Sequence, residues 1–275
     1  MTEFRAQLGV IGLGAMGRPM AENLLKAGQS VVVYDVASDT AAALQARGAA
    51  VAPSPAALAK ASEIVHVIVR TEEQVEEVLF GTDGGVAGSL PVGGIILIHS
   101  TISPEGCRRA AERAGEHRLA LLDAPVTGSV NGAVEGTLTF IVGGPAEAVE
   151  RCRPAFDILG SRVITVGGPG DAQVAKFVNN MLAGVNSVAV AEGLALGRAA
   201  GLSDAAVMEV VNAGTGASFM STMRDAVLEM ARVSDLADLG YKDLQLALEQ
   251  AHRRQLALPV TALATQYLAD YFEHH

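Results

Sequence analysis

Aromatic and basic residues are scarce in this sequence of 275 residues. Tryptophan is absent, aromatic side chains make up 4%, and 30 acidic residues outnumber 20 basic ones, for a formal net charge of −10. Few rings are available for stacking on bases, and the negative charge opposes nonspecific binding to DNA or to an anionic membrane. No stretch reaches the roughly 20 consecutive apolar residues that a membrane-spanning helix needs. We therefore expect neither a nucleic-acid partner nor a membrane partner.

Cysteine is also rare. Cys107 and Cys152 are the two cysteines, and they form neither a C-x-x-C pair nor a cluster with histidines. The sequence supports neither a disulfide framework nor a metal site, and we expect a protein of the reducing cytoplasm.

Apolar residues, at 50%, are abundant enough for a large core, and the chain length favours two domains. Short β-branched runs alternate with alanine-rich stretches in the first half, which is the pattern of a doubly wound parallel sheet. The expected strands are Leu8–Ile11, Val31–Tyr34, Ile64–Val69, Ile95–Ile98, Leu119–Leu122, Leu138–Val142 and Val163–Val166.

Helix-start signals lie between these strands. The expected helices at 40–46, 56–60 and 106–114 follow Ser38-Asp39, Ser54-Pro55 and Ser103-Pro104. After Gly170 the strand pattern ends, and a long helix is expected over Ala172–Ala200, with further helices around Asp204–Asn212, Thr222–Met230 and Tyr241–Arg254. We predict an α/β fold, with a doubly wound Rossmann domain over residues 1–168 and an all-α domain over 169–275, joined by the long helix.

A glycine-rich segment follows the first expected strand. It comprises Gly12, Leu13, Gly14, Ala15, Met16 and Gly17, a G-x-G-x-x-G pattern that opens an amphipathic helix. Gly12 permits a tight turn, Gly14 lets the backbone approach phosphates, and Gly17 lets helix and strand pack closely. The helix start directs N–H groups at a pyrophosphate, so we expect a dinucleotide there; a glycine turn without a ligand is the alternative.

Asp35 ends the second expected strand, at the position where an acid accepts hydrogen bonds from the adenosine ribose hydroxyls. A 2′-phosphate would be repelled by this carboxylate, and Val36 and Ala37 offer no compensating cation. The pattern therefore favours NAD over NADP, unless Asp35 merely caps a turn.

A second loop rich in turn formers, Asp123–Leu138, directly follows a strand. Such a loop lies at the carboxyl edge of the sheet, where open α/β folds bind ligands. Thr127, Gly128 and Ser129 would present donors to a substrate carboxylate there.

In four blocks the sequence resembles the β-hydroxyacid dehydrogenase family, the group of 3-hydroxyisobutyrate dehydrogenase and tartronate semialdehyde reductase. The blocks are Gly12–Leu24, Asp123–Leu138, Lys176–Asn180 and Lys242–Leu244, and together they span nearly the whole chain. The resemblance implies that Lys176 is the catalytic acid/base. An ammonium near a carbonyl that accepts a hydride stabilises the developing oxyanion and supplies its proton.

Asn180 lies one helical turn beyond Lys176, where it would orient Lys176 or a substrate oxygen. In relatives the Thr127 loop binds the substrate carboxylate. The same resemblance places further residues near the cofactor: Val69, Arg70, Gln74, Thr101 and Lys242. The alternative is that Lys176, Gln74 and Lys242 are ordinary surface residues.

The sequence also departs from the family pattern. Thr127 replaces the usual serine and Ser129 the usual glycine, which crowds the anion pocket. Arg70 stands where proline is usual, and His99 where aspartate is common. The usual aromatic residue upstream of Lys242 is missing among 234–236.

The leading hypothesis is an NAD-dependent dehydrogenase of a short 3-hydroxy acid such as 3-hydroxyisobutyrate. The runner-up is an NAD(P)H-dependent reductase of tartronate, glyoxylic or succinic semialdehyde. A noncatalytic dinucleotide-binding protein is the third reading, disfavoured by the joint presence of Lys176, Asn180 and the Thr127 loop. Lys176 also argues against the related imine reductases, which replace it. The apolar helix over 177–196 predicts a homodimer or homotetramer.

Overall fold

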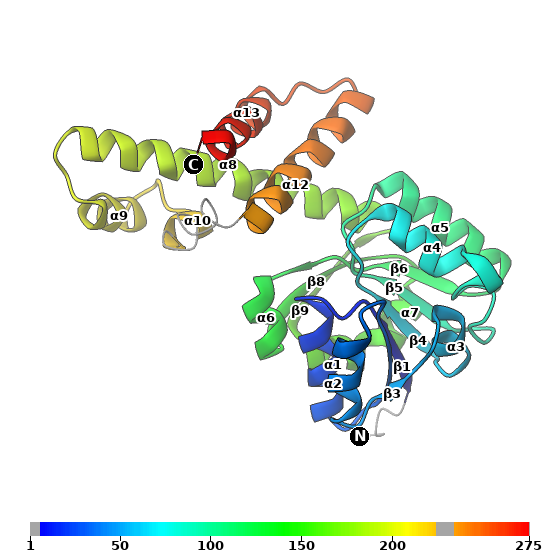
Figure 1. Ribbon diagram of the computed structural model, residues 1–275. Helices are drawn as coiled ribbons and strands as arrows, with labels where there is room; N and C mark the ends of the chain where they lie inside the picture. Colours follow the sequence, from blue (N-terminus) through cyan, green and yellow to red (C-terminus); the bar gives the residue numbers. More distant parts are fainter. Residues whose placement is uncertain (1–5, 224–233, 275) are drawn as a thin grey trace. The chain divides into compact units, whose positions relative to one another are not determined.

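The computed structural model describes residues 6–223 and 234–274. The chain divides into two compact units, Met1–Lys176 and Phe177–His275. The first is a layered α/β unit and the second is built from helices (Figure 1). The α/β class and the helical second part are confirmed, whereas the boundary between residues 168 and 169 stays a prediction.

A single sheet forms the centre of the first unit. Its strands are β1 (Gln7–Ile11), β2 (Ser30–Tyr34), β3 (Ala50–Val51), β4 (Ile64–Val67), β5 (Ile95–Ile98), β6 (Ala120–Asp123), β7 (Val126–Thr127), β8 (Leu138–Gly143) and β9 (Gly160–Gly167). The order is β3-β2-β1-β4-β5-β6-β8-β7, with β9 also paired to β8, and the strands from β3 to β6 run parallel. The strand order reverses between β1 and β4, the position where open α/β sheets bind ligands.

Alternate strand residues fill two separate cores, one on each face of the sheet. In β5, Ile95 and Leu97 belong to the first core, whereas Ile96 and Ile98 belong to the second. The first core also contains side chains of α1 (Gly17–Lys26), α2 (Ser38–Gln45), α6 (Ser129–Glu135) and α7 (Ala146–Leu159). The second contains side chains of α3 (Pro55–Lys60), α4 (Glu72–Phe80) and α5 (Pro104–Glu116). The predicted doubly wound architecture is therefore confirmed.

The sheet differs from the expected parallel one at one end. Every strand expected from the sequence is present, but β8 runs antiparallel to both β6 and β7. The two-residue strands β3 and β7 are too short to leave a periodic pattern. The turn that carries the Asp123–Leu138 loop reverses the chain direction, which is why β8 cannot continue the parallel order.

Two of the three expected helix caps are present. Ser54 Oγ accepts from the Ala57 N–H (3.1 Å) and Ser103 Oγ from the Gly106 N–H (2.9 Å). The third expectation is wrong, because α2 already begins at Ser38 and its N-cap is Ala37. Asp39 instead lies in the first turn, where its charge complements the helix dipole.

The second unit follows from a long helix, α8 (Asp171–Ala199), which begins within the first unit and confirms the expected joining helix. The other helices are α9 (Asp204–Ala213), α10 (Phe219–Thr222), α12 (Ser234–Arg253) and α13 (Pro259–His274). The helix expected over Thr222–Met230 lies outside the described residues except at its first two positions. Within the described ranges, no helix is long and apolar enough to cross a membrane.

The two cysteines are buried in different cores. Cys107 lies in the second core and Cys152 in the first. Burial raises the pKa of both thiols, that of Cys152 to about 12. Both therefore act as small apolar residues rather than as nucleophiles. The described part of the chain contains no group of three or more metal-ligating side chains.

Candidate active site

The glycine-rich loop joins β1 to α1. Gly12 has a positive φ of 91°, and a Cβ there would lie 2.1 Å from the Ile68 carbonyl oxygen. A Cβ on Gly17 would lie 1.9 Å from the Gly12 oxygen, so Gly17 is required for close packing of helix and loop. Gly14 has no atom within 4 Å of its Cβ position, and both Gly14 and Ala15 are exposed. The loop is open where a phosphate would approach it.

No side chain caps the N-terminus of α1, and its N-cap is Met16. The first N–H groups of a helix have no partners within that helix, and the helix dipole gives this end a partial positive charge. The segment from Gly14 to Gly17 therefore offers donors to an anion without any basic residue in the loop.

Asp35 lies directly after β2 and is half-buried. Its Oδ2 accepts from the Leu13 N–H (2.5 Å) and its Oδ1 from the Ala37 N–H (2.7 Å). The carboxylate thus fixes the glycine-rich loop to the end of β2. Each oxygen retains a second lone pair, so this structural bond is compatible with a ribose hydroxyl as a further donor.

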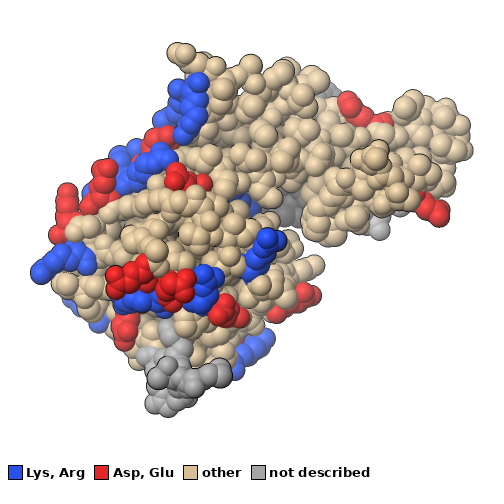
Figure 2. Space-filling view, turned by 180° about the vertical axis from the view of Figure 1, so that it is seen from behind, with Lys and Arg blue, Asp and Glu red and all other residues tan. Residues whose placement is uncertain are grey.

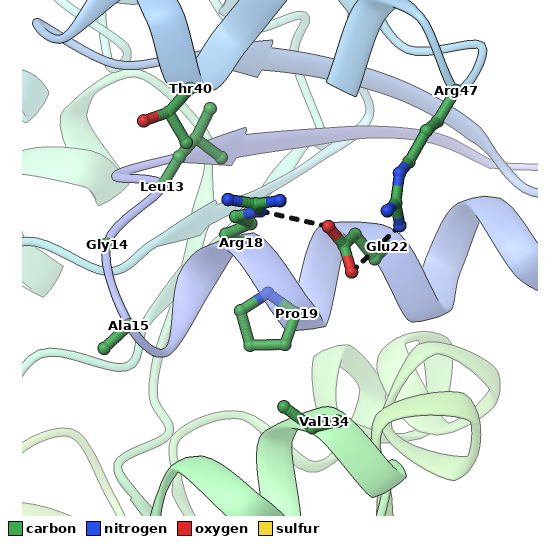
Figure 3. A pocket seen from close by; sticks show the side chains of 9 residues that line it. All are labelled: Leu13, Gly14, Ala15, Arg18, Pro19, Glu22, Thr40, Arg47 and Val134. Atoms are coloured by element: carbon green, nitrogen blue, oxygen red, sulfur yellow. Dashed lines mark hydrogen bonds and ion pairs between the residues drawn. The ribbon is translucent and has the colours of Figure 1, made fainter. Parts of the chain in front are cut away.

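A hollow of about 410 Å³ lies beside this loop, lined by Leu13, Gly14, Ala15, Arg18, Pro19, Glu22, Thr40, Arg47 and Val134 (Figure 3). Glu22 forms ion pairs with Arg18 and with Arg47, and the nitrogen–oxygen distance is 3.1 Å in each (Figure 3). Two arginines and one glutamate leave an excess of one positive charge in the lining of this hollow. Arg18, Glu22 and Arg47 were not among the predicted site residues, although Arg18 and Glu22 follow the glycine loop at i,i+4 spacing.

Side chains accept hydrogen bonds from backbone N–H groups in the turn that follows β4. The Val69 N–H donates to Ser100 Oγ (2.9 Å), and the Arg70 N–H donates to Gln74 Oε1 (2.9 Å). Gln74 therefore shapes the turn after β4 and is more than a surface residue. Thr101, next to Ser100, is half-buried.

A buried histidine pair is formed by His66 of β4 and His99, which directly follows β5. His99 Nδ1 lies 2.7 Å from the Ala124 oxygen, so Nδ1 carries the hydrogen and Nε2 accepts from His66 Nδ1 (2.9 Å). Both rings are fully buried, and burial lowers the pKa of His99 to about 4 and that of His66 well below its usual value. The pair stays neutral near neutral pH. His99 thereby fixes the carbonyl that precedes the Thr127 loop.

Thr127 ends β7, and Gly128 and Ser129 begin α6 with positive φ values of 127° and 60°. Gly128 and Ser129 are exposed, and Thr127 is half-buried. The left-handed backbone at Ser129 is unusual for a residue with a Cβ and favours glycine. Steric strain at this position gives a physical reason for the glycine that the family pattern has there.

Lys176 and Asn180 occupy one face of α8, one turn apart, and both are half-buried. Asn180 Nδ2 donates to Asp243 Oδ2 (2.6 Å), and its Oδ1 accepts from Asn179 (3.0 Å). Within the second unit, Asn180 is thus joined to α12 beside Lys242. The expectation that Asn180 orients Lys176 stays a prediction.

A Rossmann sheet with an open glycine loop at its switch point and an acid after β2 defines a dinucleotide-binding domain. Residues 7–168 match a family model described as the NAD binding domain of 6-phosphogluconate dehydrogenase. Residues 170–274 match one described as NAD-binding of NADP-dependent 3-hydroxyisobutyrate dehydrogenase. The chain belongs to the β-hydroxyacid dehydrogenase family, and the expected family and NAD-type cofactor are confirmed.

The relatives agree with this assignment. The chain is 40% identical to 3-hydroxyisobutyrate dehydrogenase of Pseudomonas aeruginosa, over 92% of this chain and 88% of that one. It is 37% identical to 2-hydroxy-3-oxopropionate reductase of Escherichia coli, over 93% and 88%. A solved structure of Mycobacterium tuberculosis 3-hydroxyisobutyrate dehydrogenase with L-serine is 29% identical, with a TM-score of 0.87 over 99% of this chain and 95% of that chain. The chain is an NAD(P)-dependent oxidoreductase of hydroxy acids.

Proposed function

We propose that the enzyme oxidises a short 3-hydroxy acid with NAD, and that Lys176 is its acid/base. Bound NAD would supply the hydride acceptor for the oxidation, and the Lys176 amine takes the proton of the substrate hydroxyl. In the reverse reduction, the Lys176 ammonium returns that proton to the carbonyl oxygen. The observation that most supports this role is the position of Lys176 on α8, one turn after the segment hydrogen-bonded to the ends of β5 and β6.

The substrate carboxylate is proposed to bind at Thr127, Gly128 and Ser129. The hydroxyls of Thr127 and Ser129 and the exposed backbone supply donors without a cation, which suits a small monoacid. The extra Cβ and hydroxyl at Ser129 reduce the space there, so we propose a small substrate. Asn180, Val69, Arg70, Gln74, Thr101 and Lys242 keep the roles that the resemblance gives them as part of the same proposal.

NAD rather than NADP is the proposed physiological cofactor. Asp35 stands where a 2′-phosphate would lie, and the neighbouring Val36, 92% exposed, and Ala37 provide no cation. The 2′-phosphate of NADP and the Asp35 carboxylate would repel each other because both are negatively charged.

The test of the proposed function is the Lys176→Ala variant. We expect turnover to fall by roughly 10²–10⁴ while NAD binding, measured by calorimetry, changes little. Full turnover in this variant would overturn the role of Lys176.

A second candidate is reduction of a semialdehyde as the physiological direction. The E. coli relative named 2-hydroxy-3-oxopropionate reductase favours it, because its identity to this chain is close to that of the dehydrogenase relative. Both directions use the same Lys176 chemistry. The ratio of kcat/KM for hydroxy acid with NAD to that for semialdehyde with NADH decides between them.

We further infer that the enzyme is a homo-oligomer of the cytoplasm. Exposed positions on α8 form an apolar stripe at helical spacing, Val178, Leu182, Ala189, Gly193 and Leu196. Val178, Leu182 and Leu196 are 50%, 52% and 74% exposed. On the face seen in Figure 2, the helical unit at the upper right has few charged side chains. Burial of this stripe by a second copy removes its apolar surface from water.

Leu182→Glu tests this inference. We expect light scattering to report a smaller species for this variant than for the wild type, with Leu202→Glu as a control at an exposed leucine outside α8. A wild-type protein that is already monomeric at micromolar concentration would refute the inference.

A further inference from the structure

The first turn of α8 is held by a buried polar cluster, which we call the α8 clamp: Ser100, Ile102, Asp123 and Gln173. The Gln173 N–H donates to Asp123 Oδ2 (3.1 Å), and the side-chain Nε2 of Gln173 donates to the Ser100 oxygen (3.1 Å). Its Oε1 accepts from the Ile102 N–H (3.2 Å). Gln173 and Asp123 are both fully buried. Gln173 thus joins α8 to the segment after β5 through its side chain and to the end of β6 through its backbone N–H.

Asp123 caps α8 from another element. It is the last residue of β6, and its carboxylate accepts from an N–H group in the first turn of α8, where intrahelical acceptors are missing. The helix dipole stabilises a negative charge at this end. Its second oxygen, Oδ1, has no hydrogen-bond partner among the described residues. A Cβ on Gly143 would lie 2.4 Å from that oxygen, so position 143 of β8 accommodates the carboxylate because it is a glycine.

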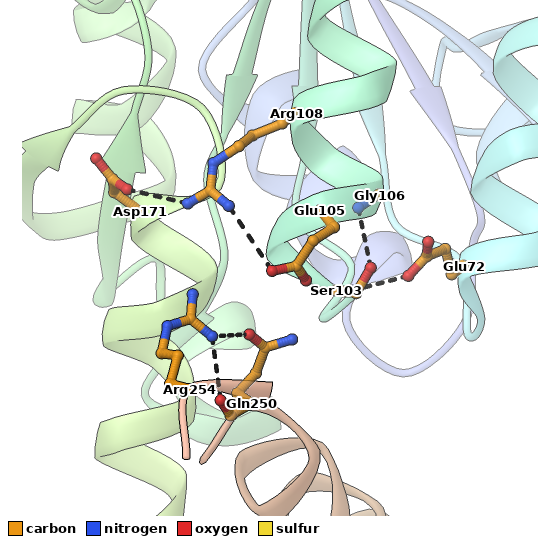
Figure 4. A network of polar contacts seen from close by, with 8 residues as sticks. All are labelled: Glu72, Ser103, Glu105, Gly106, Arg108, Asp171, Gln250 and Arg254. Carbon is orange, nitrogen blue, oxygen red and sulfur yellow. Dashed lines mark hydrogen bonds and ion pairs between the residues drawn. The ribbon is translucent and has the colours of Figure 1, made fainter. Parts of the chain in front are cut away.

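Contacts outside the α8 clamp support the same helix start. Arg108 of α5 pairs with Asp171 at 3.4 Å (Figure 4), and the Gly168 N–H donates to Asp171 Oδ2 at 3.0 Å. Gly170 has a φ of 89°, and a Cβ there would lie 2.6 Å from the Pro104 oxygen. The backbone before α8 is therefore packed closely against the start of α5.

The α8 clamp is one helical turn from Lys176. Residues three apart share a helix face and differ in height by about 4.5 Å, so a shift of Gln173 moves Lys176 with it. The strand ends that Gln173 joins lead directly to Thr101 and to the Thr127 loop. We propose that Gln173, with Asp123, is a positioning residue that sets the place of the Lys176 ammonium relative to the substrate loop. This proposal rests on the proposed role of Lys176.

The nearly isosteric Gln173→Met variant tests the proposal. It keeps the backbone bond to Asp123 and removes both side-chain bonds. Because a misplacement of about 1 Å costs up to about 10²-fold in rate, we expect kcat to fall by about 10-fold or more. KM for the hydroxy acid and Kd for NAD should stay within about twofold, since neither ligand contacts Gln173 in this proposal.

Ser62→Ala is the matched control. Ser62 is also buried and donates a hydrogen bond to the Leu58 oxygen (2.8 Å), in a part of the unit remote in sequence from α8. We expect its kcat to stay near the wild-type value. Unchanged kcat in Gln173→Met, or an equal loss of kcat in both variants, would overturn the proposal.

Gln173→Glu provides a second readout if the methionine variant does not fold. An ionised glutamate cannot donate to the Ser100 oxygen, whereas a protonated one can, and burial raises the pKa of such a carboxyl. The ratio of kcat between Gln173→Glu and the wild type should rise as pH is lowered from about 8 to about 6. A ratio independent of pH would contradict the proposal.

Failure of this proposal is distinguishable from failure of the proposed function. Full turnover in Lys176→Ala removes the acid/base role itself. An inactive Lys176→Ala beside a fully active Gln173→Met removes only the positioning role.

Discussion

At the scale of single residues, Asp35 combines a structural role in the fold with the cofactor role that we propose for it. Its position after a strand predicts a ribose ligand, whereas its bonds to the Leu13 and Ala37 N–H groups also tie the loop to β2. Only the fold reveals the second function, because the loop and the strand end are brought together by the β1–β2 pairing. A change at Asp35 therefore affects both cofactor choice and stability.

Asp35→Asn should lower the preference of kcat/KM for NAD over NADP by about 10-fold, since the amide no longer repels a 2′-phosphate. The variant should also lose about 1–2 kcal/mol of unfolding free energy, because the amide oxygen can replace one carboxylate oxygen but the amide NH2 cannot accept from the second backbone N–H. Asp39→Asn, a nearby exposed carboxylate, is the control. An unchanged cofactor preference in Asp35→Asn would contradict the proposed basis of NAD selection.

Ser129 holds a left-handed backbone with φ of 60°. Ser129→Gly relieves the contact between Cβ and the backbone, so we expect a gain of about 1 kcal/mol in unfolding free energy, measured with urea. Ser129→Ala keeps the Cβ and should show no such gain. Equal stability of the glycine and alanine variants would show that the strain is absent.

At the scale of elements, the glycine loop and α1 illustrate what spacing alone can predict. The G-x-G-x-x-G pattern correctly predicts a turn between a strand and a helix, and the space around each glycine now assigns separate roles. Gly17 is needed for packing because its Cβ would meet the Gly12 oxygen, whereas the Cβ position of Gly14 is open.

Gly14→Ala and Gly17→Ala should therefore fail in different ways. Gly14→Ala should leave the melting temperature of the cofactor-free protein nearly unchanged and weaken NAD binding by about 10-fold or more, because the added methyl occupies the phosphate approach. Gly17→Ala should destabilise the protein by about 3 kcal/mol, because the added methyl group overpacks the contact with the Gly12 oxygen. Thermal unfolding and calorimetry of both variants provide the test. A stable Gly17→Ala, or tight NAD binding by Gly14→Ala, would contradict these assignments.

Contacts between distant elements mark the limit of the sequence analysis. Strong β-branched runs predict the longer strands, because local burial on both faces decides them. The antiparallel β8, the α8 clamp and the Asn180–Asp243 bond depend on pairs far apart in the chain, and a single sequence contains no signal for such pairs. The sequence identifies Lys176, but the contacts that hold its helix become visible only in the fold.

At the scale of the whole molecule, buried titratable groups give stability an acid dependence. Unfolded histidines bind protons near pH 6.5, whereas buried His99 does so only near pH 4 and His66 well below 6.5. Their contribution to stability is present above about pH 6.5 and is lost as pH falls through about 4. Burial raises the pKa of Asp123 from 3.8 to about 6, so its contribution is present below 3.8 and is lost as pH rises through about 6. Among these three groups the two histidines outweigh the aspartate, so their combined contribution to stability falls as the pH is lowered.

Substitutions of His66 and Asp123 should change the pH dependence of the unfolding free energy in opposite directions. Between about pH 6 and about pH 4.5, His66→Leu should make the unfolding free energy less dependent on pH, by at most about 1.4 kcal/mol per pH unit, which is the slope for one proton. Asp123→Asn should make the pH dependence steeper, by at most the same amount. The exposed His117→Gln controls for the loss of a ring without the loss of a buried contact. Parallel urea-unfolding curves for all variants across this pH range would contradict the assignment.

The central claim is that Lys176 transfers the proton while NAD takes the hydride from a short 3-hydroxy acid. Its most direct test is NADH formation by the wild type and by Lys176→Ala, with a panel of short 3-hydroxy acids and with NAD and NADP side by side. We expect turnover by the wild type with NAD and at least one of these acids, and loss of that turnover in Lys176→Ala with NAD binding retained. Equal turnover by the two proteins, or a wild type that binds NAD but turns over neither these acids nor the matching semialdehydes, would contradict it.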